Sequence, residues 1–181
     1  MSELIIYPHD APQQPTLRVT APDDIAAALA RVGVRYERWQ ATADLDESAD
    51  QDAILTAYRE DVDRLSDEQG YRSVDVVRLR PDHPDRDALR RKFLDEHTHA
   101  EDEVRFFVEG GGAFYLHLDG QVHQVNCTRG DLLSVPAGTP HWFDMGPAPL
   151  FTAIRLFTNP DGWIATFTGS PIASTFPRYG E

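Results

Sequence analysis

Short runs of alternating apolar and polar residues, separated by glycine and proline, fill the chain from Phe93 onward. The runs are VRFFVEGGG, AFYLHLDGQVHQV, DLLSVPAGTPHWF and PLFTAIRLF. Alternation with a period of two is typical of strands with one buried face, and turn residues at regular spacing indicate a sandwich or barrel. Asp119-Gly120 predicts a tight hairpin, because glycine readily takes the positive φ that such turns need. We therefore predict a mainly β fold, an antiparallel β-barrel of the jelly-roll type with a few peripheral α-helices.

The first half of the chain mixes short strands with amphipathic helices. The pattern predicts strand pieces at 5–7, 17–19, 35–40 and 73–80. It predicts helices after Asp23 or Asp24, over 48–69 and over 84–92. Gly33 and Gly70 are expected to end the first two helices, because glycine adopts the left-handed conformation that follows many helices. These helices each have one apolar face and are expected to pack against the barrel.

The length and composition limit the possible architectures and partners. A chain of 181 residues is expected to form one domain over 1–181, since single cores grow to roughly 150 to 200 residues. We expect helices and strands over 1–92 and a metal-binding β-barrel core over about 73–165. The net charge of −13 argues against nucleic acid or an anionic membrane as partner, because both bind cationic faces.

The lengths of the apolar runs and the single cysteine predict the cellular location of the protein. No run of about 18 apolar residues is present, and the first residues lack the features of a secretion signal. Cys127 has no second cysteine to pair with, which fits a reducing compartment. We expect a cytoplasmic monomer that binds a small molecule.

The segment EHTHAEDEVRFFVEG contains candidate metal ligands. His97 and His99 are two residues apart, so on a strand their imidazoles leave the same face. If the chain turns tightly after them, the Glu103 carboxylate returns to the same point, giving a set of two histidines and one carboxylate. That set suits ferrous iron and leaves open positions for a substrate and O2. His141, which follows the rigid PAGTP turn, is a candidate fourth ligand, whereas an isolated H-x-H is more often an exposed pair.

The spacing around these ligands matches two motifs of a known superfamily. The first is H-x-H-x3-E-x6-G, from His97 to Gly110, and the second is G-x5-P-x-G-x2-H, from Gly130 to His141. In this order on a β-rich chain they resemble the two motifs of the cupins. The asparagine that often follows the last histidine is replaced by Met145. The resemblance implies a cupin-type barrel with one metal ion.

A longer string narrows the resemblance to one family. The string FLDEHTHAEDEVRFFVEGGGAFYLHL over 93–118, with GDLLSVPAGTPHWFD, IRLF and NPDGW after it, resembles the acireductone dioxygenases. The resemblance implies one Fe2+ or Ni2+ per monomer, bound by His97, His99, Glu103 and His141. It also implies cleavage of 1,2-dihydroxy-3-keto-5-methylthiopentene by O2 in methionine salvage. The iron form gives formate and 2-keto-4-methylthiobutyrate, and the nickel form gives formate, carbon monoxide and 3-methylthiopropionate.

Two arginines are candidates for binding an anionic substrate. Arg105 shares the inward parity of Glu103, and a buried guanidinium needs a negative charge to meet, so a substrate oxygen is its expected partner. The dianion of an ene-diol supplies such an oxygen, and Arg105 is the candidate for generating and holding it. Arg155 lies in an apolar run, where it either pairs with a structural carboxylate or supports Arg105. We expect aromatic residues to wall the apolar tail of the substrate, unless they belong to the core: Phe93, Phe143 and Trp163.

The remaining acids of the segment are sorted by strand parity. Glu96 and Asp102 have the opposite parity to the histidines and are expected to hold ligands or backbone in place, or to lie in solvent. The family resemblance gives Glu96 a role in metal incorporation and Asp102 a role in relaying changes from the metal site. Glu101 shares the inward parity, so its role stays open. His117 and His123 complete no ligand set by spacing, and a structural role is favoured for both.

Two other functions remain possible at this stage. A different metal-dependent cupin enzyme, a dioxygenase or an isomerase, shares the four ligands but not Arg105 with the aromatic wall. A non-catalytic cupin that binds a small ligand or stores metal is the third hypothesis. Open coordination positions argue against storage, because a storage site normally closes its coordination sphere.

Overall fold

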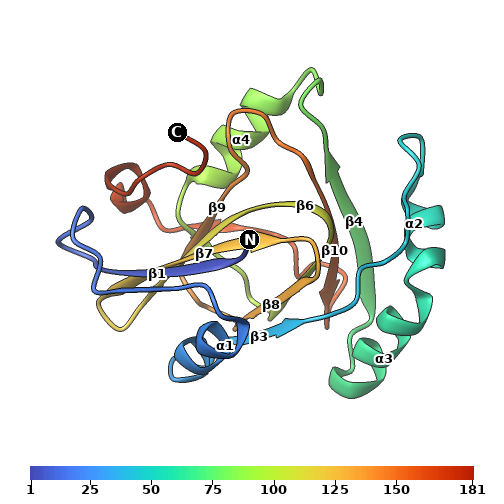
Figure 1. Cartoon of the computed structure of the whole chain (residues 1–181), viewed down its shortest axis with the longest axis horizontal. Helices are drawn as coiled ribbons and strands as arrows, with labels where there is room; N and C mark the ends of the chain where they lie inside the picture. The colour runs from blue at the N-terminus through green and yellow to red at the C-terminus, as the bar shows by residue number, and fades with distance from the viewer.

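The computed structural model describes residues 1–181, which form two antiparallel β-sheets that share one long strand, β6 (Glu103–Leu118). Figure 1 shows β6 crossing the middle of the molecule. The first sheet has the order β11 (Thr166–Phe167), β5 (His97–Thr98), β9 (His141–Asp144), β6, β7 (Gln121–Thr128), β1 (Glu3–Pro8), β2 (Leu17–Val19). The second has the order β4 (Ser73–Leu79), β10 (Phe151–Phe157), β6, β8 (Asp131–Val135), β3 (Arg35–Arg38). The predicted mainly β, antiparallel architecture is confirmed.

Glycines allow β6 to pass from one sheet to the other. Its first residues pair with β8 and β10, and its residues from Gly111 onward pair with β7 and β9. Gly110 has a φ of 58°, and a Cβ atom there would lie 1.8 Å from the Leu150 carbonyl oxygen. At Gly111 a Cβ atom would lie 2.0 Å from the Cys127 carbonyl oxygen. Only glycine tolerates such close backbone approaches, so these residues permit the crossing.

The main core lies between the inward faces of the two sheets. Leu4, Phe114 and Val125 come from the first sheet, and Leu133 and Phe151 come from the second; all are fully buried. The alternation of the strands places every second side chain in this core, as the sequence pattern predicted. Burial of these large side chains is the main stabilising term of the barrel.

Four α-helices pack around the sheets (Figure 1). Helix α1 (Pro22–Ala30) contacts β3, and helix α4 (Arg86–Leu94) contacts β9. Helix α2 (Gln51–Ala57) contacts β4 and lies beside α3 (Arg59–Gln69). None of them is long and apolar enough to cross a membrane.

Two details of the helix predictions are wrong. The expected helix over 48–69 is interrupted at Tyr58, which has φ −116° and ψ 24° and separates α2 from α3. Tyr58 is buried with its ring edge-on to Phe106, so packing against the sheet overrides the helical pattern. The N-cap of α1 is Ala21, whereas Asp23 and Asp24 lie in the first turn, where their charges face the positive end of the helix dipole.

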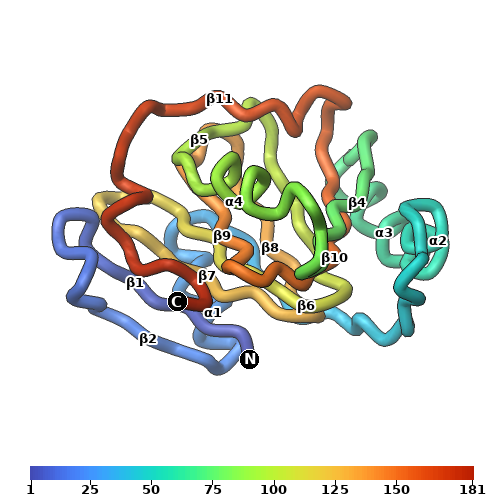
Figure 2. Tube along the Cα trace, turned by 90° about the horizontal axis from the view of Figure 1, so that it is seen from above, coloured from blue at the N-terminus to red at the C-terminus, as the bar shows by residue number.

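The chain after β10 returns along the outside of the first sheet. β11 pairs with β5, and a 3-10 helix (Ile172–Thr175) precedes Phe176. Figure 2 shows this segment passing β5 and coming back toward β1. Phe176 packs on Tyr7 and Trp142, and the Tyr115 hydroxyl donates to the Pro177 carbonyl at 2.7 Å. The C-terminal residues therefore cover an apolar face that the barrel leaves exposed.

A fully buried carboxylate, Asp131, connects the N-terminus with β3 and β8. Its Oδ1 atom accepts from the Tyr36 hydroxyl at 2.6 Å and from Arg38 at 2.7 Å. Its Oδ2 atom accepts from the Ser2 hydroxyl at 2.6 Å and from the Thr128 backbone N–H at 2.7 Å. All lone pairs that a carboxylate presents are thus used, as a buried charge requires.

We predict that Asp131→Ala lowers the free energy of unfolding by about 3 kcal/mol, because it leaves four donors, two of them on the buried residues Ser2 and Tyr36, without their common acceptor. Urea denaturation followed by circular dichroism measures this change. Asp82→Ala, at an exposed turn position without a side-chain hydrogen bond, is the matched control and should change the value by less than about 0.5 kcal/mol. Equal midpoints for the two variants would contradict the anchoring role of Asp131.

Candidate metal centre

Three strands bring the predicted ligands to one end of the barrel. His97 lies on β5 and His99 one residue beyond it, Glu103 is the first residue of β6, and His141 is the first residue of β9. β5 and β9 pair through a single register position, His97 opposite His141. Strand ends therefore hold side chains that are far apart in sequence against one another.

The four side chains meet in a buried cluster. One nitrogen atom from each of His97, His99 and His141 lies within 4.8 Å of the others. The Glu103 Oε2 atom lies 3.3 Å from His99 Nε2 and 3.3 Å from His141 Nε2. All four residues are buried. The buried three-histidine site fits a metal ion.

Backbone carbonyls fix the orientation of all three imidazoles. The Nδ1 atom of His97 lies 2.7 Å from the Asp95 carbonyl oxygen, that of His99 3.0 Å from the Ile164 oxygen, and that of His141 2.8 Å from the Thr139 oxygen. A carbonyl oxygen only accepts, so each Nδ1 carries the proton and donates. In the neutral imidazole, Nε2 then presents a free lone pair, which is the form of histidine that binds metals.

The charges of the cluster favour a cation at its centre. Burial, reinforced by the neighbouring His141, lowers the pKa of His97 to about 4, so its imidazole is neutral near pH 7. Burial acts to raise the pKa of Glu103, but the Arg105 guanidinium together with His141 and His99 outweighs burial and holds that pKa well below the ordinary value. The Arg105 Nε–H donates to Glu103 Oε1 at 2.6 Å. Glu103 is therefore an anion whose other oxygen, Oε2, faces the imidazoles.

Two buried atoms of the cluster lack a hydrogen-bond partner. They are Glu103 Oε2 and His141 Nε2. With the proton of His141 on Nδ1, both atoms are acceptors facing each other at 3.3 Å, an arrangement that costs free energy unless a cation lies between them. Three nitrogen ligands and one oxygen ligand suit a divalent first-row transition metal. The residues present thus fit the ion that the sequence motifs predict.

A cavity of about 520 Å³ opens next to the imidazoles. We call it the ligand cavity. Its polar lining includes His97, His99 and Arg105, and its apolar lining includes Phe93 and Trp163. The other lining residues are Val77, Lys92, Arg155, Ile164, Ala165 and Phe167. The cavity therefore has a cationic end beside the candidate metal ligands and an apolar end at its mouth.

The structure places the two predicted arginines side by side. Arg105 and Arg155 are register partners on β6 and β10, and both line the ligand cavity. Arg155 also forms two hydrogen bonds with Asp75, at 2.8 and 2.6 Å. Pairing with a structural carboxylate and a position beside Arg105 in the cavity are therefore compatible for Arg155, because its guanidinium pairs with Asp75 and still lines the cavity.

The aromatic candidates divide into two kinds. Phe93 and Trp163 line the cavity, and Trp163 is 51% exposed at its mouth. Phe143 does not line the cavity but lies in the core, 1% exposed, with its ring 4.9 Å from the Arg105 guanidinium carbon. The Phe114 ring centroid lies 4.8 Å from the same guanidinium carbon, so cation–π contacts with these two rings stabilise the position of Arg105.

The three other acids of the motif lie outside the cluster. Glu96 is buried and accepts from His117 Nδ1 at 3.0 Å and from the Thr168 hydroxyl at 2.7 Å. Asp102 accepts from the Ala137 backbone N–H at 2.8 Å, in the turn that precedes His141. Glu101 accepts from the Thr158 hydroxyl. Strand parity left open whether Glu101 faces the metal ligands. The contact with Thr158 shows that its carboxylate is directed to the 158–168 segment instead.

Lys92 and Asp75 are residues of the site that the sequence did not suggest. Lys92 lines the cavity from the last turn of α4, and Asp75 orients Arg155 from β4. A lysine in an exposed helix carries no signal of its own. Asp75 has such a signal, since it interrupts the apolar run SVDVV on a strand beside β10.

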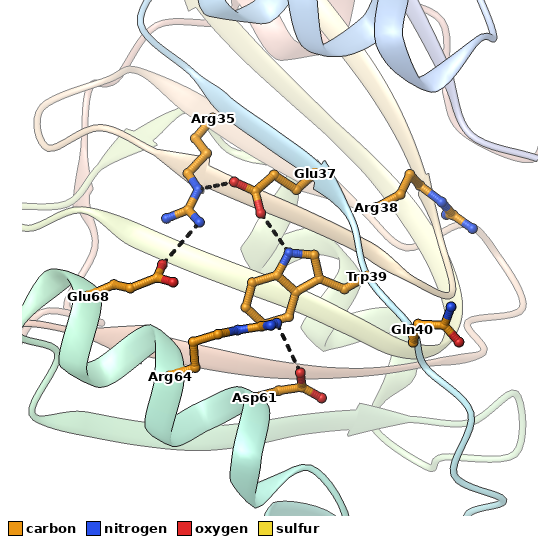
Figure 3. A pocket seen from close by; sticks show the side chains of 8 residues that line it. All are labelled: Arg35, Glu37, Arg38, Trp39, Gln40, Asp61, Arg64 and Glu68. Carbon is orange, nitrogen blue, oxygen red and sulfur yellow. Dashed lines mark hydrogen bonds and ion pairs between the residues drawn. The ribbon is translucent and has the colours of Figure 1, made fainter.

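A second pocket lies between β3 and α3, away from the imidazoles (Figure 3). Arg64 covers the Trp39 ring at 4.0 Å and pairs with Asp61, and Arg35 pairs with Glu37 and with Glu68. Its cations are thus already paired with acids and leave no free charge for an anionic ligand. The ligand cavity is the better candidate for chemistry.

Comparisons with known proteins give a consistent match. The model of the ARD/ARD′ family matches residues 3–165. The acireductone dioxygenase of Parvibaculum lavamentivorans is 57% identical over 179 residues, covering 99% of this chain and 97% of the relative, and that of Pseudomonas aeruginosa is 56% identical over 177 residues, covering 98% of each. A solved acireductone dioxygenase from Bacillus anthracis, with a cadmium ion in its active centre, superposes with a TM-score of 0.81 at 29% identity, covering 92% of this chain and 98% of that one.

We predict that Glu103→Gln weakens divalent metal binding by more than about 100-fold, because the neutral amide removes the anion that faces the three imidazoles. Metal content after dialysis, measured by atomic emission, tests this. Glu101→Gln is the matched control, since its carboxylate contacts Thr158 instead of the cluster, and it should retain one metal per chain. Metal loss from the Glu101 variant with retention in the Glu103 variant would reverse the assignment.

Proposed function

The chain belongs to the ARD/ARD′ family, and from that premise we propose that it is an enzyme that cleaves acireductone, 1,2-dihydroxy-3-keto-5-methylthiopentene, with O2 in methionine salvage. The observation that carries the proposal is the convergence of three imidazoles and the Glu103 carboxylate beside a cavity with a cationic and an apolar end. The activity needs both the ligand cluster and the cavity, because the cluster would bind the metal and the cavity would select the substrate that reaches it.

Four residues of the cluster would hold the metal: His97, His99, Glu103 and His141. A bound Fe2+ or Ni2+ ion, one per chain, would supply Lewis acidity toward the substrate oxygens. In this proposal the chain loaded with iron would give formate and 2-keto-4-methylthiobutyrate, and the chain loaded with nickel would give formate, carbon monoxide and 3-methylthiopropionate. The residues of the chain orient the ligands, which the three hydrogen bonds to backbone carbonyls support.

Arg105 is proposed to hold the negative charge of the substrate. An ene-diol reacts with O2 most readily as its dianion, so a fixed cation beside its oxygens favours the loss of the second proton. Arg105 is 3% exposed and Glu103 neutralises it through one N–H, which leaves other N–H groups for the substrate. Arg155 and Lys92 add positive charge to the same cavity, so an anionic substrate is favoured over a neutral one.

The apolar end of the cavity is proposed to bind the methylthio tail. Phe93, Trp163 and Phe167 present hydrocarbon surface at the mouth, two of them about half exposed. Covering these side chains with an apolar tail removes them from water and stabilises the complex. The tail would also exclude water from the charged end of the cavity.

Glu96 and Asp102 are proposed to act through other residues. Asp102 holds Ala137, and the Gly138 backbone N–H next to it donates to the His99 carbonyl at 2.9 Å. This route supports a relay between the turn before His141 and the segment that carries His99. Glu96 precedes His97 directly and ties it to Thr168 and His117, which supports a role in building the metal site.

We further propose that the protein acts as a cytoplasmic monomer. All residues of the cluster and the cavity come from one chain, so the site is complete without a partner. Cys127 is a free, buried thiol, which suits a reducing compartment.

Light scattering of the metal-loaded protein tests the proposed monomeric state. A measured mass equal to that of two chains would contradict it.

We predict that the metal-free protein, reconstituted anaerobically with Fe2+ or Ni2+, consumes acireductone on addition of O2. The iron form should yield 2-keto-4-methylthiobutyrate, and the nickel form should yield carbon monoxide. Product analysis by chromatography and gas detection distinguishes the two. Substrate loss that is no faster with metal than without it would refute the proposed activity.

We predict that Arg105→Lys retains metal but lowers kcat by about 100-fold, because an ammonium does not reproduce the two-directional contacts of the guanidinium. Steady-state kinetics on protein of measured metal content test this. Arg64→Lys, whose guanidinium lies on Trp39 in the second pocket, is the matched control and should keep full activity. An Arg105→Lys variant without metal would instead assign Arg105 a purely structural role in orienting Glu103.

A further inference from the structure

Two histidines far apart in sequence meet outside the ligand cavity. His9 follows β1, and His117 lies near the end of β6. The His9 Nδ1 atom lies 3.3 Å from the His117 Nε2 atom, and the two rings are inclined by 51°. His9 is exposed and the His117 side chain is 24% exposed, so solutes reach the space between these nitrogens.

A buried carboxylate orients His117. The His117 Nδ1 atom lies 3.0 Å from Glu96 Oε2, and Glu96 is only 4% exposed. A carboxylate accepts, so Nδ1 carries the proton and Nε2 presents its lone pair toward His9. A histidine that donates one ring N–H to a carboxylate is the usual partner arrangement of a metal ligand, because it fixes the tautomer and raises the basicity of the other nitrogen.

The backbone also holds His9 in place. The His9 backbone N–H donates to the Gly120 carbonyl oxygen at 3.0 Å, in the turn between β6 and β7. The residue is therefore anchored to the same hairpin that carries His117. Little ordering of the chain is needed before both imidazoles contact one ligand, which favours binding.

We propose that His9 Nδ1 and His117 Nε2 form a second metal site, for a divalent ion of the zinc, nickel or copper kind. Two nitrogen ligands about 2.1 Å from one tetrahedral ion lie about 3.4 Å apart, close to the observed 3.3 Å. Imidazole nitrogen suits these ions better than it suits Mg2+ or Ca2+. Water completes the coordination sphere, and the net charge of −13 favours a cation at the surface.

This site is separate from the four-ligand cluster and does not depend on the proposed activity. Its three supporting residues, His9, His117 and Glu96, are not among the ligands of the inner ion. Occupancy ties the end of β1 to β6, so a bound ion stabilises the folded chain.

Zinc uptake by the nickel-loaded protein tests the proposal. Protein that carries one Ni2+ per chain is dialysed against increasing Zn2+, and both metals are measured. We expect the natural sequence to gain one Zn2+ per chain while it keeps its Ni2+. His9→Gln should need at least about tenfold more Zn2+ for the same uptake. His83→Gln, which alters a half-buried histidine with no second imidazole beside it, is the control and should behave as the natural sequence does.

Thermal unfolding gives a second readout. Zn2+ should raise the Tm of the nickel-loaded natural sequence and of His83→Gln by about 3 °C or more, and should leave that of His9→Gln unchanged. Uptake of Zn2+ only in exchange for Ni2+, or equal uptake by His9→Gln and the natural sequence, would overturn the proposal.

Discussion

The pairing of Glu103 with Arg105 is the interaction on which the site depends. A carboxylate that is 1% exposed stays ionised only when a cation compensates for its lost hydration, and Arg105 does so at 2.6 Å. The same contact leaves the second oxygen of Glu103 free to face the imidazoles of His99 and His141, each with its Nε2 atom at 3.3 Å. Because Arg105 keeps Glu103 ionised inside the core, the cluster retains a carboxylate anion, and this anion favours a metal cation at the centre of the cluster.

Much of this arrangement follows from the sequence, because strand geometry is local. The alternation around EHTHAEDEVRFFVEG predicts that His97 and His99 share a face, and that Glu103 and Arg105 share one. Parity fails only at Glu101, where the chain bends between β5 and β6 and a period of two no longer applies. The fold class follows from the same alternation, repeated over the strands of the second half.

Other parts of the structure depend on contacts between distant segments. Lys92 enters the cavity because α4 packs beside β9, and no local pattern marks it. The break at Tyr58 is set by Phe106, which lies on a strand almost 50 residues later. The neighbourhood of His9 and His117 arises from the position of β1 beside β7 in the sheet. Residue spacing carries information within an element, whereas these contacts require the topology.

The hydrogen bond from His99 to the Ile164 carbonyl joins the metal ligands to the mouth of the cavity. Ile164 and its neighbour Trp163 form part of the cavity wall, so one short segment both orients a ligand and contacts whatever enters. Thermodynamic linkage then requires reciprocity: a molecule that binds the wall in one position changes the affinity for the ion by the same factor by which the ion changes the affinity for that molecule. The affinity of the cavity for an entering molecule and the affinity of the cluster for the ion are therefore coupled.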